Sequence, residues 1–282
     1  MHLGAHMSIA GGLHKAVERI MAVDGTALQI FTRNQRQWKV PPLTDEAIGL
    51  FAEARARWGD HPVAAHDSYL INMASPKPEA AEKSRNAFAE ELRRCQALDI
   101  PWLVTHPGSH LGTGAQQGLA TYATNLDAAI EQSETDSVTV LLETTAGQGT
   151  NLGSTFEELA RIMEASRLEH RLGVCFDTCH AFAAGYDLRT AKAYEATFAE
   201  FDRLIGVERI GFFHLNDSKT ALGEKKDRHE HIGKGHIGET GFGLLMNDVR
   251  FADRPGTLET DKGDDLEEDR RNLALLRSLM RG

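Results

Sequence analysis

The stretch VCFDTCHAFAAGYD, Val174 to Asp187, decides the predicted fold. Its first residues, Val174 to Phe176, form a short apolar run typical of a buried strand. Asp177 lies at the carboxyl end of that run, and His180 follows one helical turn later, so both side chains converge above the strand. A buried strand, a polar strand end and a helix are therefore predicted here as one unit.

Similar units run along the whole chain, with no low-complexity segment and no change of composition that would mark a linker. The predicted strands are His2–His6, Ala27–Phe31, Val63–His66, Trp102–His106, Val138–Glu143, Gly173–Asp177, Ile210–Leu215 and Thr257–Glu259. Apolar residues at helical spacing lie between the strands, Ser154 or Thr155 is a candidate N-cap for the fifth helix, and a last helix runs through Leu266 to Met280.

The strand ends are 25 to 45 residues apart, which predicts an α/β fold, a (β/α)8 TIM barrel forming a single domain over residues 1–282. A doubly wound open sheet is the structural alternative. That fold usually has fewer strands, and no Gly-x-Gly-x-x-Gly follows the first predicted strand.

Composition limits the class of protein. No apolar run reaches the ~18 residues that a membrane span needs, and the N-terminus lacks the features of a signal peptide, so we expect a cytoplasmic protein. Three cysteines, Cys95, Cys175 and Cys179, are too few for a disulfide framework and are expected to be free thiols, with Cys175 and Cys179 assigned to packing. The net charge of −10 argues against a polyanionic partner, although it counts neither bound metal nor a local basic patch.

Seven of the eight predicted strands carry a histidine, aspartate or glutamate at the last residue or, for His214, at the residue before it. The carboxyl ends of barrel strands form the active-site mouth, and imidazole with carboxylate is the ligand set of a catalytic zinc, manganese or iron site. The candidate ligands on strand ends are His66, His106, Glu143, Asp177, His214 and Glu259.

Each of these candidates has a simpler alternative. A lone histidine such as His66 is more often a core or capping residue than a ligand, and Glu143, behind an apolar run, would also be satisfied by an arginine. His110 lies past a Pro-Gly turn and is expected to be solvated. Asn216, Asp217 and Lys219 are candidates to contact ligands or substrate.

The segment DRHEHIGKGHIG, Asp227 to Gly238, is the most unusual in composition. Asp227 and His229 are two residues apart in a predicted extended loop, so they face the same way and can chelate one ion. A solvated loop is the alternative. The glycines also suggest a phosphate cradle, but no Gly-Lys-Ser/Thr follows a strand.

Together these segments closely resemble the endonuclease IV family of apurinic/apyrimidinic DNA-repair endonucleases. The resemblance runs from about residue 3 to the last helix and is carried by GAHMSIAGGL, FTRNQRQW, HDSYLIN, HPGSH, AGQGTNLG, CFDTCHAFAAGYDLRT, HLNDSK, DRHEHIGKGHIG and LET. It implies a (β/α)8 barrel with three zinc ions per chain, for which Mn²⁺ is a substitute.

The resemblance also implies which residues bind each ion. His66 and His106 would hold the first zinc, and Glu143 would bridge it to a second. The second would also take Asp177, His214 and Glu259, and the third would be held by His180, Asp227 and His229. Thr144 departs from the family, which commonly has Asn after the bridging Glu.

The implied reaction is hydrolysis of the phosphodiester 5′ to an abasic site in duplex DNA, leaving a 3′-hydroxyl and a 5′-deoxyribose phosphate. Glu143 and Glu259 would be catalytic, with Glu259 orienting the nucleophile. A 3′-phosphodiesterase activity on blocked ends, no membrane, no organic cofactor and a monomer are also expected.

Arg36, Tyr69 and Leu70 are assigned to DNA by the resemblance, since wedge residues open a duplex more cheaply where a base is missing. Ordinary loop packing is the alternative for Tyr69 and Leu70. Arg33 and Lys39 are expected to add local positive charge. The rival functions are a two-metal sugar isomerase of a related barrel and a zinc protein that binds damaged DNA without cutting it.

Overall fold

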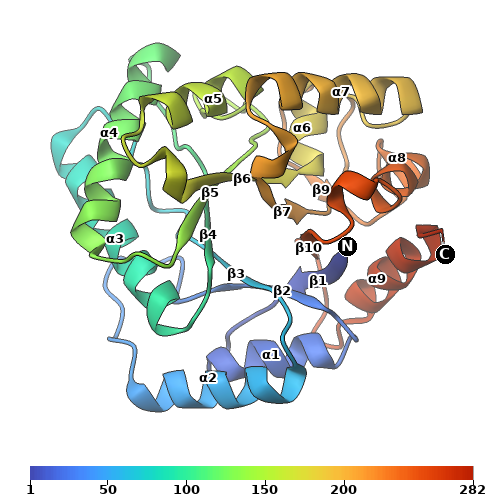
Figure 1. The fold of residues 1–282 in the computed structure, drawn as a ribbon, viewed down its shortest axis with the longest axis horizontal. Helices are drawn as coiled ribbons and strands as arrows, with labels where there is room; N and C mark the ends of the chain where they lie inside the picture. Colours follow the sequence, from blue (N-terminus) through green and yellow to red (C-terminus); the bar gives the residue numbers. More distant parts are fainter. Residues whose placement is uncertain (282) are drawn as a thin grey trace.

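The computed structural model describes residues 1–281 and contains a closed barrel of eight parallel strands surrounded by helices (Figure 1). The barrel strands are β1 (His2–His6), β2 (Ala27–Phe31), β3 (Val63–His66), β4 (Trp102–Thr105), β5 (Thr139–Glu143), β6 (Leu172–Asp177), β7 (Ile210–His214) and β10 (Pro255–Leu258). Each pairs with its neighbour in sequence order, and β10 closes the ring against β1 and β7.

The helices lie outside the ring, and the two termini lie on the same side of the molecule (Figure 1). They are α1 (Leu13–Met21), α2 (Asp45–Trp58), α3 (Pro78–Ala97), α4 (Ala115–Ser133), α5 (Phe156–Ala165), α6 (Thr178–Ala184), α7 (Ala191–Leu204), α8 (Gly238–Met246) and α9 (Glu267–Leu279), with short 3-10 turns η1 (Glu169–Arg171), η2 (Val207–Arg209) and η3 (Val249–Phe251). The predicted TIM barrel is thereby confirmed.

Three predicted strand ends lie just outside their strands. His106 follows the end of β4, Leu215 follows the end of β7 and Glu259 follows the end of β10. His106 is followed by Pro107, which has no amide hydrogen with which to extend the strand pairing of β4. At the fifth helix Thr155 is the N-cap, because its hydroxyl accepts from the amide of Glu158 at 3.2 Å.

The stretch that decided the fold is a strand joined directly to a helix. Asp177 ends β6 and also caps α6, its Oδ1 accepting from the amide of His180 at 2.7 Å. A carboxylate at this position satisfies an amide that would otherwise have no partner and favours the positive end of the helix. The cap therefore fixes Asp177 and His180 relative to each other.

The strand pleat builds two layers inside the barrel. The lower layer is apolar and consists of Ala64, Val104, Leu141, Cys175 and Phe212, with Trp102 packed against it. Successive side chains of a strand alternate in direction, so the residue two positions further along each strand also points inward, one layer higher. These residues are His66, His106, Glu143, Asp177 and His214. An apolar floor thus underlies five candidate ligands, and Cys175 belongs to that floor.

A two-stranded antiparallel sheet covers part of the mouth. It consists of β8 (Asp217–Ser218) and β9 (His229–Glu230), with Ser218 opposite His229. His229, predicted in an extended loop, is therefore held by strand pairing, while Asp227 lies in the loop before β9.

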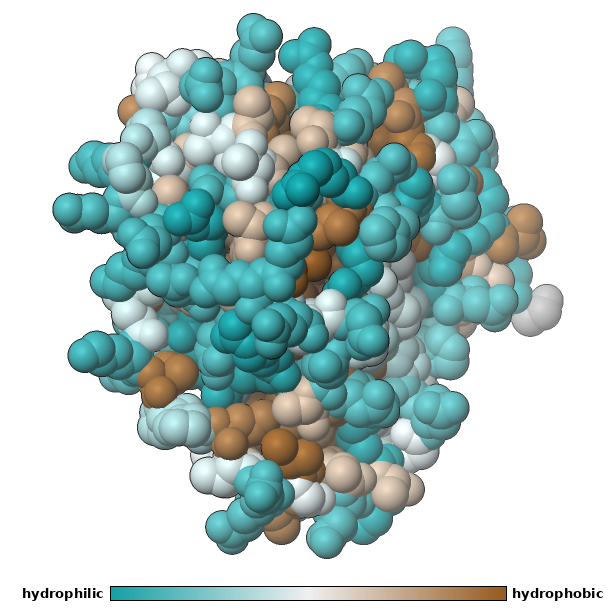
Figure 2. Space-filling view, turned by 60° about the vertical axis from the view of Figure 1, so that its left-hand side comes forward, coloured by the Kyte–Doolittle hydropathy of each residue, from teal (hydrophilic) through white to brown (hydrophobic). Residues whose placement is uncertain are grey.

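None of the helices within residues 1–281 is both long and apolar enough to cross a membrane. Figure 2 shows a mostly hydrophilic face on which apolar side chains occur in small groups. All three cysteines are buried and free.

The close approach of β1 and β2 generates a stability prediction. A Cβ added at Gly4 would lie 1.6 Å from the carbonyl oxygen of Ala27 in β2, so Gly4→Ala should destabilise the protein by about 3 kcal/mol or more. Urea unfolding measures the change. The matched control is Gly49→Ala in α2, where a Cβ meets nothing within 4 Å. That change should stabilise by ~0.5–1 kcal/mol, and equal stability of both variants would contradict the prediction.

Candidate metal centre

The nine predicted ligands lie together at the carboxyl ends of the barrel strands. Within each of three groups the ligand atoms lie within 4.8 Å of one another. The groups are His66, His106 and Glu143; Glu143, Asp177, His214 and Glu259; and His180, Asp227 and His229. A fourth combination, Asp177, Cys179 and His229, overlaps the other groups, and the Cys179 thiol lies 3.5 Å from the carbonyl oxygen of Arg228.

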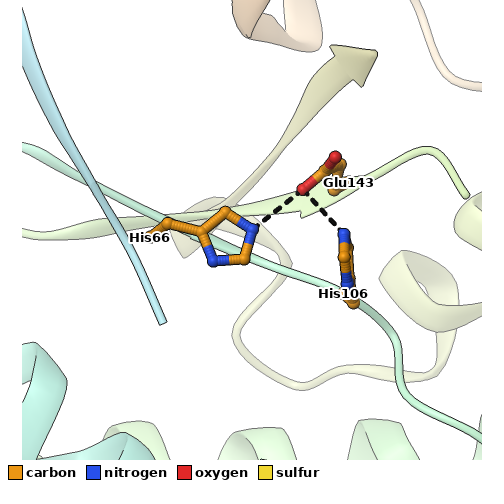
Figure 3. Close-up of side chains that lie close together, drawn as sticks. All are labelled: His66, His106 and Glu143. Carbon is orange, nitrogen blue, oxygen red and sulfur yellow. Dashed lines mark hydrogen bonds and ion pairs between the residues drawn. The ribbon is translucent and has the colours of Figure 1, made fainter. Parts of the chain in front are cut away.

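Glu143 is the centre of the cluster. Its Oε2 lies 3.1 Å from Nε2 of His66 and 3.1 Å from Nε2 of His106, and both rings point at this oxygen (Figure 3). Its Oε1 lies 3.0 Å from Nδ1 of His214 and 3.1 Å from Nδ1 of His180. Imidazoles, not the arginine considered from the sequence, therefore neutralise this carboxylate. One of its oxygens faces His66 and His106, and the other faces His214 and His180.

The charges of the cluster depend on one another. Burial alone would raise the pKa of Glu143, but the imidazoles, His106 and His214 foremost, hold that pKa well below its usual range. Burial would lower the pKa of His66, but the hydrogen bond and charge of Glu143 outweigh it and raise that pKa to about 9. The Glu143 carboxylate is therefore ionised in the structure, and positive charge must stand beside it.

The imidazoles are oriented through their second ring nitrogens. Nδ1 of His66 lies 2.8 Å from the carbonyl oxygen of Asp67, and Nδ1 of His180 lies 2.9 Å from that of Thr144. Nδ1 of His229 lies 3.4 Å from the carbonyl oxygen of Glu259. A carbonyl only accepts, so each of these nitrogens donates, and in the neutral ring Nε2 then directs a lone pair into the cluster.

These residues fit divalent metal ions. When the imidazoles are neutral, lone pairs of nitrogen and carboxylate oxygen face each other across 3.0 to 3.2 Å with no hydrogen between them. Such an arrangement requires cations in the cluster, either protons on the rings or metal ions. Oriented imidazoles together with carboxylates are the donor set of a catalytic zinc site.

Two polar residues at the mouth, Gln29 and His6, were not assigned from the sequence, and a third, Asn216, was predicted only as a contact to ligands or substrate. Gln29 in β2 donates from Nε2 to Oε1 of Glu259 at 2.6 Å, and its Oε1 lies 2.8 Å from Nε2 of His214. His6 lies 3.3 Å from the same Glu259 oxygen. Asn216, proposed only in general terms, donates to Asp177 at 2.7 Å and accepts from the Glu259 amide at 2.8 Å. Gln29 could have been found from the sequence, because it is the one polar residue in the otherwise apolar strand ALQIF.

Two further positions have structural roles. The hydroxyl of Thr144 accepts from the amide of Asp177 at 2.9 Å, which joins the ends of β5 and β6. The carboxylate of Asp217 accepts from the amides of Gly233, Gly235 and Ile237 at 2.9 to 3.0 Å. Backbone amides of the glycine-rich segment are thus already bonded to Asp217, which disfavours the phosphate-cradle alternative.

The predicted DNA-contacting residues lie on two neighbouring loops. Arg36 is exposed, Tyr69 is 62% exposed and Leu70 is half-buried. The hydroxyl of Ser68 donates to the carbonyl oxygen of Gln35 at 2.7 Å, which ties the loop after β3 to the loop after β2.

Arg33 was wrongly predicted to add surface charge. Its side chain is buried, and its Nε donates to Glu91 in α3 at 2.6 Å. Burial of the ion pair explains the error, because the sequence places Arg33 in the same run of cationic residues as Arg36.

A cavity of about 270 Å³ adjoins the cluster. Its lining includes Tyr69, Asn72, His106, Gln148, His180 and Asp227. Predicted ligands and a predicted DNA-contacting residue therefore border one space.

Comparisons with known proteins agree on the fold and the family. Residues 17–279 match the family model described as "Xylose isomerase-like TIM barrel". The chain is 53% identical over 279 residues to "Probable endonuclease 4" of Chloroflexus aurantiacus, covering 99% of this chain and 98% of the relative. The crystal structure of endonuclease IV from Thermus thermophilus superposes with a TM-score of 0.88 at 35% identity, covering 99% of this chain and 98% of that one.

A D-tagatose 3-epimerase-like protein superposes with a TM-score of 0.75 at 20% identity, covering 99% of this chain and 98% of that one. This second likeness shows a shared barrel only.

The raised pKa of His66 predicts a pH dependence for the metal-free protein. A group whose pKa rises from 6.5 to about 9 on folding stabilises the protein below pH 6.5, and this contribution is lost as the pH rises through 9. For His66 the loss is on the order of 3 kcal/mol. Nitrogens that bind metal carry no proton, so the zinc-loaded protein has no such proton to lose and its stability should not fall over this range.

Thermal unfolding of chelator-stripped and zinc-loaded protein between pH 6 and 9 measures the effect. The melting temperature of the zinc-loaded protein should exceed that of the stripped protein by an amount that increases as the pH rises. Parallel curves for the two forms would contradict the prediction.

Proposed function

Because the chain belongs to the endonuclease IV family, we propose that it is a zinc-dependent DNA-repair endonuclease that cuts the phosphodiester 5′ to an abasic site in duplex DNA. The products would be a 3′-hydroxyl and a 5′-deoxyribose phosphate. The observation that carries the proposal is that three ligand groups lie together beside a cavity bordered by His106, His180, Asp227 and Tyr69. A 3′-phosphodiesterase activity on blocked ends would use the same site.

In this proposal each group holds one zinc ion, with Mn²⁺ as a substitute. His66 and His106 bind the first, Asp177, His214 and Glu259 bind the second, and Glu143 bridges the two; His180, Asp227 and His229 bind the third. Bound zinc supplies Lewis acidity and lowers the pKa of water from 15.7 to about 7. Three dications would also add about +6 to the chain's formal charge of −10. This addition weakens the argument from net charge against a DNA substrate.

Glu259 is proposed to orient the attacking water. Burial would raise its pKa, but His214 and the contact with His6 outweigh burial and lower it, so the carboxylate is ionised at neutral pH. Its Oε1 accepts from Gln29, and its side chain is 14% exposed toward the mouth. An ionised, fixed carboxylate at the edge of the mouth can accept a hydrogen bond or a proton from water.

Glu143 has a different proposed role. Both of its oxygens are engaged by imidazoles and its side chain is buried, which supports a role in holding the two halves of the site together. A carboxylate shared in this way also keeps two ions at a fixed separation for in-line displacement.

Arg36, Tyr69 and Leu70 are proposed to engage the DNA around the abasic position. The Tyr69 ring lies 5.6 Å from the rings of Phe31 and His66, which support one side of an otherwise exposed side chain. A supported aromatic beside the ligand cluster is suited to enter a duplex where a base is missing. Arg36 on the tied neighbouring loop supplies charge for a phosphate.

The sugar isomerase alternative is disfavoured by two observations. The close, full-length relatives carry the name endonuclease 4, whereas the epimerase-like protein shares 20% identity. A two-metal isomerase also has less use for the third group formed by His180, Asp227 and His229.

The first functional prediction concerns substrate and Glu259. The zinc-loaded protein should nick a duplex that contains one tetrahydrofuran residue and leave the intact duplex uncut. Glu259→Gln should slow nicking by ~10²–10⁴-fold, because an amide cannot accept the proton, with DNA binding nearly unchanged. Gel assays of nicking and mobility shift measure both, with the exposed Glu157→Gln as control. Equal cutting of both duplexes would refute the proposed substrate; an unchanged rate would refute the role of Glu259.

The second functional prediction concerns Tyr69. Tyr69→Ala should weaken binding of the tetrahydrofuran duplex by ~10–100-fold through loss of aromatic stacking, with a much smaller change in the nicking rate at saturating DNA. Fluorescence anisotropy and single-turnover kinetics separate the two effects. The matched control is Val249→Ala in η3, which removes an apolar side chain that is 87% exposed. Wild-type affinity in Tyr69→Ala would favour ordinary loop packing.

A further inference from the structure

We infer that Gln29, in β2, is a positioning residue that fixes two proposed metal ligands, His214 and Glu259, with a single amide group. The inference rests on the proposed zinc binding. Gln29 is fully buried, and the polar groups it contacts, on His6, His214 and Glu259, all belong to the mouth of the barrel.

The contact with Glu259 determines which way the amide faces. An ionised carboxylate only accepts hydrogen bonds, so the group 2.6 Å from Glu259 Oε1 must be the NH₂ of Gln29. Nδ1 of His6 lies 2.9 Å from the same amide nitrogen. The carbonyl oxygen of the same amide is thereby directed at His214.

The amide oxygen in turn selects the tautomer of His214. Oε1 of Gln29 lies 2.8 Å from Nε2 of His214 and can only accept, so Nε2 carries the hydrogen. The lone pair is then on Nδ1, which lies 3.2 Å from Oε2 of Glu259 and 3.0 Å from Oε1 of Glu143. One side chain therefore presents both a nitrogen and a carboxylate to the same ion.

Gln29 differs from the anchors of the other oriented imidazoles. His66, His180 and His229 donate to peptide carbonyls, whereas His214 is anchored by a side chain. Both ligands that Gln29 contacts belong to the group formed by Glu143, Asp177, His214 and Glu259. Loss of the amide should therefore weaken the binding of one ion, at the group that contains His214 and Glu259. Binding at the group of His180, Asp227 and His229 should not change.

The test is Gln29→Leu, which puts an apolar side chain of similar size in place of glutamine and so removes the amide. Zinc content by elemental analysis should fall from three to about two ions per chain. Competition with a chelator should show one site weakened by ~10–100-fold, the usual cost of losing a residue that orients a metal ligand. Gln29→Met, unbranched and closer in length, gives the same test if leucine does not fit the barrel.

Thr257→Val is the matched control. Thr257 is buried in β10, two residues before Glu259, and its hydroxyl has no hydrogen-bond partner within residues 1–281. It should retain wild-type zinc affinity at all sites.

Three outcomes would overturn the inference. Folded Gln29→Leu or Gln29→Met with wild-type zinc content and affinity, beside a wild type that binds zinc and nicks DNA, would refute the inference alone. Loss of every ion together would show a merely structural role. A wild type that binds no zinc would refute the proposed function itself, and the inference with it.

Discussion

Three carboxylates, those of Glu143, Asp177 and Glu259, are held almost out of water at the ends of β5, β6 and β10. Removing an ionised carboxylate from water costs several kcal/mol unless positive charge and hydrogen bonds compensate it. The imidazoles, the asparagine and the glutamine around these groups supply hydrogen bonds, and the net positive charge must come from protons or metal ions. The mouth of the barrel is thus built around a requirement for cations.

The alternation of side chains along a strand explains how these groups reach one place. Each strand that contributes to the apolar floor contributes a polar side chain two residues later. Because the period is two, a one-residue slip in β5 would turn Glu143 toward the helices and Leu142 toward the ligand cluster. The floor and the ligand layer are therefore specified together, and neither can change register alone.

The barrel and the convergence of the nine side chains could be predicted because both depend on local patterns. Strand ends such as Glu143 and Asp177 are visible as polar residues behind apolar runs. Gln29 was missed because its partners lie 185 and 230 residues away, and nothing near it in the chain shows them. Arg33 was misjudged for the same reason, since its partner Glu91 comes from α3. The assignment of ions to each group stays a prediction.

The carbonyl anchors of His66, His180 and His229 have a consequence for evolutionary change. Peptide oxygens are common to every residue type, so substitutions at Asp67 or Thr144 leave these anchors in place as long as the backbone keeps its course. The orientation of these rings is inherited from the path of the main chain and is buffered against mutation. Divergence within the barrel can therefore remodel the surrounding side chains extensively before it disturbs the direction in which those rings point.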